Sequence, residues 1–194
     1  MSRISIAAAS VVTEGELTSA RLGPRFGRLD LQSRLALLAV ASLKVDFAAW
    51  SAERIGICLA ASAGSLTTDV NFWQGRNGTG GPSPTLFAYT LPSAAVGEIA
   101  IHFRLTGPNR CFVGDENILL PEASDLIRRG EVDACICVHC EVVSAECGAL
   151  IDEPPTATAR AVLLTSGGSG RGWRENDRDM KRLCKLISQV NSAG

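Results

Sequence analysis

The sequence is short of several residue types on which common functional sites depend. It has only two histidines, His102 and His139, and aromatic residues make up just 5% of its 194 residues. Its formal net charge is −1, so it has no bulk electrostatic attraction to nucleic acid or to an anionic membrane surface. It also has no apolar run of the length that a membrane span needs. We therefore expect neither a nucleic-acid partner nor a membrane partner.

The overall amino-acid composition is typical of one globular domain with a sizeable core. Hydrophobic residues make up 46% and charged residues 20% of the chain, and 194 residues correspond to about one domain. The N-terminal segment MSRISIAAASVV is interpreted as a first strand and not as a signal peptide, because Ser5 and Ser10 interrupt its apolar run. Seven cysteines, an odd number scattered through apolar segments, favour reduced thiols and a cytoplasmic location.

A cluster of cysteines near the middle of the chain invites a metal-binding interpretation. In the segment ACICVHCE, Cys135, Cys137 and His139 alternate and therefore share one face of a strand, with Cys140 on the other. Zinc ligands usually come from turns, because side chains on one straight strand do not diverge enough to surround a tetrahedral ion. The segment is interpreted as a core strand, and we expect no metal and no cofactor.

Apolar runs alternate with helical patterns along the chain. Strands are expected at 4–12, 55–62, 134–142 and 160–165, and helices at 31–45, 66–74, 94–104, 117–129 and 174–190. Asp30 is a candidate N-cap of the first helix, and Gly130 stands where a C-terminal cap of the fourth is expected. Strands alternating with helices indicate an α/β fold, in which a mostly parallel sheet is covered by helices.

Two glycine-rich segments are interpreted as connections. Residues 75–84 (GRNGTGGPSP) lack the Gly-Lys-Ser/Thr ending of a phosphate-binding loop. Residues 166–172 (SGGSGRG) have the composition of a flexible linker. The helix that follows places apolar residues on one face, namely Met180, Leu183, Cys184, Ile187 and Val190. We expect a domain at 1–166, followed at 167–194 by a flexible link and an amphipathic helix packed on it; docking of this helix on a partner is the alternative.

Several short motifs follow one another along the second half of the chain. Residues 105–109 read LTGPN, residues 127–133 read IRRGEVD and residues 137–141 read CVHCE. Together with segments 30–43 and 54–65, they resemble the N-terminal half of β-ketoacyl synthases, and more closely the short synthase-like proteins described as chain-length factors. The resemblance spans roughly residues 1–166 and implies a thiolase-like N-terminal half-fold.

The sequence departs from this family where the catalytic residues are expected. In the synthases, a nucleophilic cysteine stands at the start of the fourth helix, but here Asp115, Glu116 and Asn117 precede it. Cys111 is the nearest thiol, and its alternative interpretation is a small apolar residue of a Cys-Phe-Val strand. The family's paired histidines, or histidine and asparagine, belong to a second half that has no recognisable counterpart here. We expect no catalytic residue, with Cys111 and Glu116 as weak candidates.

The segment LFAYTLP at residues 86–92 corresponds by resemblance to a part of the synthases that lies at the dimer interface and lines the acyl tunnel of the neighbouring subunit. Bulky Phe87, Tyr89 and Leu91 alternate there with small residues, including Thr90. Aromatic side chains that reach across an interface could limit the length of a growing chain. The alternative interpretation is that Phe87 and Tyr89 fill the core.

The resemblance implies a non-catalytic subunit of the chain-length-factor type. Such a subunit would form a heterodimer with a full-length β-ketoacyl-acyl carrier protein synthase and shape its acyl tunnel in polyketide, polyene or fatty-acid synthesis. Contact with acyl carrier protein would be indirect, and a homodimer is expected when the synthase is absent. Two alternatives stay open: a stand-alone acyltransferase or malonyl decarboxylase that uses Cys111 or Glu116, and a binding module outside lipid synthesis.

Overall fold

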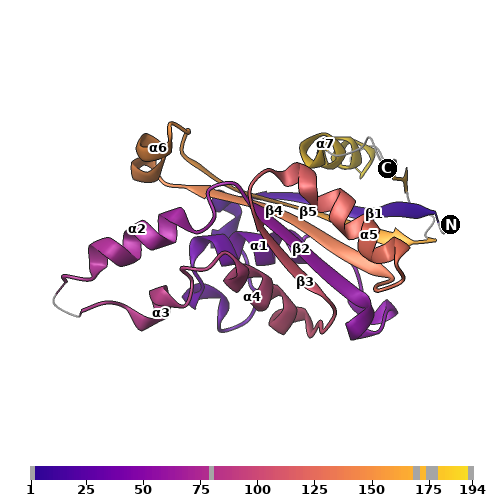
Figure 1. The fold of residues 1–194 in the computed structure, drawn as a ribbon, viewed down its shortest axis with the longest axis horizontal. Coiled ribbons are helices and arrows are strands. Elements are labelled where there is room, and N and C mark those ends of the chain that lie inside the picture. The colour runs from indigo at the N-terminus through magenta and orange to yellow at the C-terminus, as the bar shows by residue number, and fades with distance from the viewer. Residues whose placement is uncertain (1–2, 79–80, 168–170, 174–178, 192–194) are drawn as a thin grey trace.

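The chain forms one six-stranded sheet with helices on both faces (Figure 1). The computed structural model describes residues 3–78, 81–167, 171–173 and 179–191. The sheet order is β3-β2-β4-β5-β1-β6. The strands are β1 (Ile4–Thr13), β2 (Ile55–Ala61), β3 (Asn109–Val113), β4 (Ala134–Val143), β5 (Thr156–Ser166) and β6 (Arg171–Gly172).

Most strands of the sheet run in one direction. β2 pairs in parallel with both β3 and β4, whereas β5 pairs in antiparallel fashion with β4 on one side and β1 on the other. β1 to β4 therefore share one direction, and β5 runs against them from the middle of the sheet. The predicted α/β fold with a mostly parallel sheet is confirmed, and the reversed direction of β5 is the feature that the sequence pattern did not reveal.

The helices form two layers, one on each face of the sheet. The longer helices are α1 (Leu31–Ala41), α2 (Leu66–Gly75), α4 (Ser93–Phe103), α5 (Leu119–Arg128) and α7 (Met180–Asn191), and the shorter ones are α3 (Pro84–Phe87) and α6 (Ala145–Ile151). Short 3₁₀ turns occur at Glu14–Thr18, Phe26–Arg28, Phe47–Ala49, Ala52–Arg54 and Glu116–Ile118. α1 and α4 cover one face, and α5 and α7 cover the other (Figure 1).

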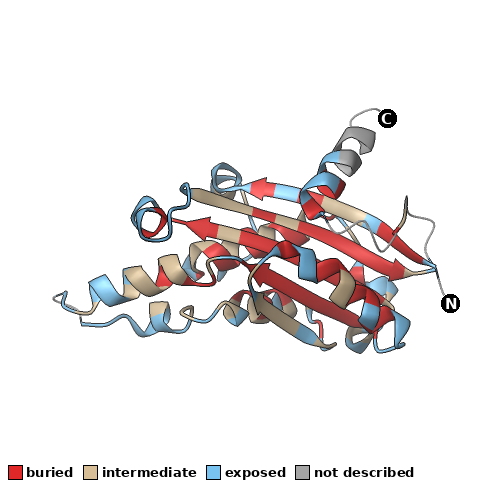
Figure 2. Cartoon of the chain, turned by 45° about the horizontal axis from the view of Figure 1, so that its top comes forward, coloured by how far each residue is buried: buried red, intermediate tan, exposed pale blue. Residues whose placement is uncertain are grey.

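The central strands supply the core between these layers. Every residue of β2 is buried, and so is every residue of β4 except Glu141, which is partly exposed (Figure 2). Alternation along β2 places Ile57 and Leu59 under α1 and α4, and Cys58 and Ala60 under α5. A strand that is covered on both faces needs no polar positions, which explains the uninterrupted apolar run in the sequence.

Capping residues set the helix boundaries much as expected. Asp30 accepts a hydrogen bond from the Ser33 amide at 2.9 Å and begins α1, which ends at Ala41, four residues before the predicted end. Gly130 adopts a φ of +70° directly after α5, a conformation that glycine adopts without a steric penalty.

The cysteines are distributed over both core layers. None of the seven, all of which lie in the described ranges, forms a disulfide. Cys135 and Cys137 lie in the cluster beneath α5, and Cys140 lies in the opposite one, as the strand alternation predicted. Cys135 Sγ is 3.8 Å from Cys58 Sγ on the neighbouring strand. In the described ranges, no group of histidine, cysteine and acidic side chains has a geometry that could hold a metal ion.

The C-terminal helix packs on the α5 face of the sheet. Met180, Leu183 and Cys184 are buried against β1 and β5, whereas the side chains of Ile187 and Val190 lie outside the described residues. Of the expected flexible link, residues 168–170 also lie outside them, and Arg171–Gly172 pair with Ser5 and Ile6 as β6. The division at residue 166 stays a prediction. No helix in the described part of the chain is both long and apolar enough to cross a bilayer.

Candidate functional site

A cavity of about 700 Å³ lies at the carboxyl ends of β2 and β4, the edge of a parallel sheet at which ligands usually bind. Its lining includes Ser62, His139, Glu141, Thr158, Arg160 and Lys181. A second cavity of about 280 Å³ shares Ser62, His139 and Lys181 with it and extends to Glu116, at the turn before α5. The two cavities together define the candidate site.

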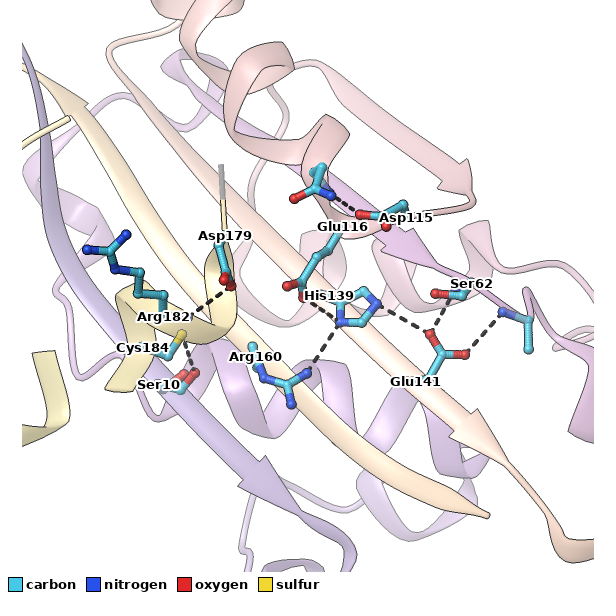
Figure 3. Close-up of polar contacts among 12 residues, drawn as sticks. Ser10, Ser62, Asp115, Glu116, His139, Glu141, Arg160, Asp179, Arg182 and Cys184 are labelled. Atoms are coloured by element: carbon cyan, nitrogen blue, oxygen red, sulfur yellow. Dashed lines mark hydrogen bonds and ion pairs between the residues drawn. The ribbon is translucent and has the colours of Figure 1, made fainter. Parts of the chain in front are cut away.

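His139 is the centre of the polar groups in this site (Figure 3). Its side chain comes from β4, is almost fully buried, and lies between two carboxylates. Nδ1 is 2.9 Å from Oε2 of Glu116, and Nε2 is 3.3 Å from Oε2 of Glu141. Burial alone would lower the pKa of His139, but its interactions with Glu116 and Glu141 outweigh burial and raise that pKa above the usual value.

Glu141 is held as a carboxylate by the loop that follows β2. Its two oxygens accept hydrogen bonds from the amides of Ser62 at 2.9 Å and Ala63 at 3.1 Å. Burial would raise the pKa of Glu141, but His139 and these two amides outweigh burial and lower the pKa to about 2. Glu141 thereby connects the end of β4 to the end of β2 and fixes the wall of the cavity.

Two further acidic residues at the site, Asp115 and Asp179, have partners within the chain. Asp115 accepts from the Asn117 amide at 2.8 Å, where it caps the turn before α5, and Asp179 accepts from the Arg182 amide at 3.0 Å, where it caps α7. Both helices thus begin at the site.

The two ring nitrogens of His139 both lie beside carboxylates. The ring therefore acts first as a cation that binds Glu116 and Glu141, and it is poorly placed to act as a general base.

The two predicted catalytic candidates lie on different faces of the sheet. Glu116 is buried and lies in the site beside His139. Cys111 is half-buried on β3 and packs against the core under α1 and α4, on the face away from α5. Burial raises the pKa of the Cys111 thiol, which disfavours the nucleophilic thiolate. The strand interpretation of Cys111 is confirmed, because it lies within Asn109–Val113.

Sequence reasoning did not identify His139, Arg160 and Lys181 as members of one site. The alternation along β4 placed His139 on the face shared by Cys135 and Cys137, but only the antiparallel pairing of β4 with β5 places Arg160 opposite His139. A guanidinium nitrogen of Arg160 lies 3.4 Å from Nδ1 of His139 (Figure 3). Lys181 comes from α7. The apolar face of α7 predicts that the helix packs on something, but it does not show where on the sheet the helix lies.

The predicted tunnel residues lie at another part of the surface, which we call the α2–α3 arm: α2, α3 and the segment that continues to Leu91. Phe87 is 62% exposed and Leu91 65%, and Trp73 on α2 is 63% exposed. The Phe72 and Phe87 rings are 5.4 Å apart. Together with neighbouring residues, Phe72, Trp73 and Phe87 line an open apolar pocket of about 400 Å³. Phe87 therefore does not fill the core, contrary to the alternative interpretation.

The other two residues of this segment are held locally. The Tyr89 hydroxyl donates to Oε1 of Glu98 at 3.1 Å, and its half-buried ring packs against the core. The Thr90 hydroxyl donates to the Phe87 carbonyl at 2.8 Å. These contacts fix the backbone between Phe87 and Leu91 and leave those two apolar side chains on the surface.

No protein-family model matches the sequence, and no curated protein matches it either. Solved structures do match its fold. One is the ketosynthase ApeO in complex with its chain length factor ApeC from Xenorhabdus doucetiae, with a TM-score of 0.66 and 19% identity over 86% of this chain and 80% of that one. Another is the ishigamide ketosynthase/chain length factor, with a TM-score of 0.69 and 18% identity over 88% of this chain and 64% of that one.

A third match is the AntDE:AntF complex of a type II polyketide acyl-carrier protein and its hexaketide-bound ketosynthase. Its TM-score is 0.68, with 13% identity over 86% of this chain and 63% of that one. The chain therefore has the thiolase-like ketosynthase fold that the motifs implied. It spans less than two thirds of the second and third of these matched chains.

Proposed function

We propose that this chain is a non-catalytic subunit of the chain-length-factor type. It pairs with an active β-ketoacyl-acyl carrier protein synthase and shapes the acyl tunnel of that partner, in polyketide, polyene or fatty-acid synthesis. The observation that supports this proposal most is the exposed apolar surface of the α2–α3 arm, considered with a fold shared with ketosynthase and chain length factor structures. Acyl carrier protein would reach the pair through the synthase.

The α2–α3 arm has the character of an interface that is exposed in the isolated chain. Trp73, Phe87 and Leu91 together expose far more apolar surface than single scattered residues do, and such patches mark sites of association. Aromatic residues of this kind supply much of the binding energy at protein interfaces.

The arm ends beside a free edge of the sheet. Among the described strands, β3 is outermost and has a neighbour on one side only. Its last residue, Val113, is 69% exposed and lies with Pro92 near the backbone of Gly64. An edge strand offers unpaired backbone groups to another chain. β3 and the arm could therefore serve one partner together.

The residues at the site favour a non-catalytic role. The helix start that presents the nucleophile in the resembled synthases is occupied by Glu116, whose carboxylate is held by His139. Cys111 packs on the other face of the sheet with a raised pKa. His102 is exposed on α4, away from this site.

The proposal is tested by co-expressing the chain with a ketosynthase from the same organism and measuring the mass of the complex and its product lengths. We expect a one-to-one complex, and longer products when Phe87→Ala removes the aromatic ring. Val11→Ala is the matched control, because Val11 is an exposed apolar residue on β1, towards the other edge of the sheet. A complex whose products are unchanged by Phe87→Ala contradicts the tunnel-shaping role. No complex at all favours a binding module outside lipid synthesis.

The position of Glu116 supports a second candidate function, a stand-alone malonyl decarboxylase. Glu116 lines a cavity at a helix start and lies against a cationic imidazole. Release of carbon dioxide from a malonyl thioester by the purified chain, abolished by Glu116→Gln and kept in Glu122→Gln, would establish this function in place of the first. Glu122 is the matched control because it lies on α5 and pairs with Arg110 outside the cavity.

A further inference from the structure

The larger cavity runs along two paired strands, and its lining changes from charged to apolar along them. His139, Glu141 and Val143 of β4 stand opposite Arg160, Thr158 and Thr156 of β5. Because residues two apart share a face and a strand rises about 3.3 Å per residue, this stripe is about 13 Å long. It is cationic at the Arg160 end, and apolar side chains line the end near Val143, among them Leu66 and Ile151.

The charged groups of the site are unevenly partnered. The Glu116 carboxylate is held by His139, and the Glu141 carboxylate by His139 and two backbone amides. The carboxylates of Asp115 and Asp179 cap helices. Within the described ranges, however, neither Arg160 nor Lys181 forms a salt bridge with a carboxylate. Arg160 instead lies against His139, which is itself cationic when protonated. An anion is the group that would complete this arrangement.

We propose that this cavity binds a carboxylate that has an apolar chain of medium length. Its carboxylate pairs with Arg160 and Lys181, and its chain lies along Val143 and Leu66. The planar guanidinium matches a carboxylate through two parallel hydrogen bonds, and a volume of about 700 Å³ is within the usual range of ligand sites. Phosphate shares the anionic chemistry, but the apolar wall favours a ligand with a hydrocarbon chain.

Glu141 and Glu153 are the acidic side chains that line the larger cavity, and both are compatible with this ligand. The oxygens of Glu141 are directed to the amides of Ser62 and Ala63 and to His139. Glu153 is exposed and belongs to the loop before β5, beyond the apolar end of the stripe and away from Arg160. The site involves this chain alone, so it does not depend on the proposed pairing with a synthase.

The test is calorimetric titration of the purified full chain with octanoate, acetate and inorganic phosphate. We expect saturable binding of octanoate, and weaker binding of acetate and phosphate, because neither has an apolar chain. Arg160→Gln should weaken octanoate binding about tenfold to a hundredfold, since hydrogen bonds to a charged group contribute about 1.5–3 kcal/mol. Lys185→Gln is the matched control, because Lys185 is an exposed cation of α7 that does not line the cavity.

Two further variants keep the test decisive if Arg160→Gln fails to fold. Arg160→Lys retains the charge without the planar group and should weaken octanoate binding by a smaller factor. Leu66→Ser should weaken the binding of octanoate and leave that of acetate unchanged. The proposal is overturned if octanoate does not bind saturably, if the Arg160 variants bind it as tightly as the natural chain, or if phosphate binds as tightly as octanoate.

Discussion

The cavity beside His139 and the α2–α3 arm contrast in how far the chain satisfies its own groups. At the cavity, His139 and Glu141 of β4 meet Glu116 of the turn before α5 and two backbone amides of the loop after β2, and both of these largely buried carboxylates have partners. On the arm, the side chains of Trp73 and Phe87 remain in water. The largely buried carboxylates of the cavity thus have partners within the chain, whereas the large apolar side chains of the arm are left exposed. Mutations of His139 and of these carboxylates should therefore affect folding, and mutations on the arm should affect association.

The largest effect on folding is expected at His139. His139→Ala leaves the buried Glu116 without its cationic partner, and breaking a buried pair in this way costs about 3–5 kcal/mol of unfolding free energy. His102→Ala is the control: this second histidine is exposed on α4 and should change stability by about 0.5 kcal/mol at most. Urea unfolding of both variants measures the difference. Equal stabilities would show that the cluster at His139 does not hold the fold together.

A smaller, pH-dependent effect is expected at Glu141. Its pKa of about 2 in the folded chain lies below the unfolded value of 4.5, so its contribution is present above pH 4.5 and is lost as the pH falls towards 2. By pH 3 the loss should be about 2 kcal/mol. Glu141→Gln, which cannot titrate, should therefore lose about 2 kcal/mol less between pH 7 and pH 3. Parallel losses in the two proteins would contradict the assigned pKa.

The smallest effect on folding is expected on the arm. Phe87 is mostly in water, so Phe87→Ala should change the unfolding free energy of the isolated chain by about 0.5 kcal/mol or less. Leu120→Ala, at a fully buried position of α5, should cost about 2–5 kcal/mol in the same urea experiment. A large loss in Phe87→Ala would show that the arm is part of the core and would remove the contrast with the cavity.

The sequence predicts the centre of the fold better than its edges. β2 and β4 begin at the predicted residues because helices cover both faces of the sheet there, so that each strand starts with a run of apolar residues. β3 was predicted only as a Cys-Phe-Val strand around Cys111 and without bounds, since only five residues form it and none of them is buried. Its status as a strand depends on pairing with β2, a contact between distant parts of the chain that no local pattern encodes.

The same reason explains what was missed at the candidate site. Glu116 was singled out because a helix start can be recognised in the sequence, but its partner His139 is 23 positions away along the chain and comes from a different element. The approach of Arg160 to His139 depends on the exact register of β5 against β4. The exposure of the Phe87 side chain could not be predicted from the sequence either. The alternation of large and small residues around Phe87 fits a core segment as well as a surface segment.

Light scattering after size-exclusion chromatography of the chain, co-expressed with a ketosynthase from its own organism, shows whether the arm is an interface for a synthase. We expect a one-to-one complex that dissociates when Trp73, Phe87 and Leu91 are replaced together by serine, while the isolated variant keeps its unfolding free energy. A chain that elutes apart from the synthase, or a complex that persists after these three substitutions, would rule out the arm as the interface.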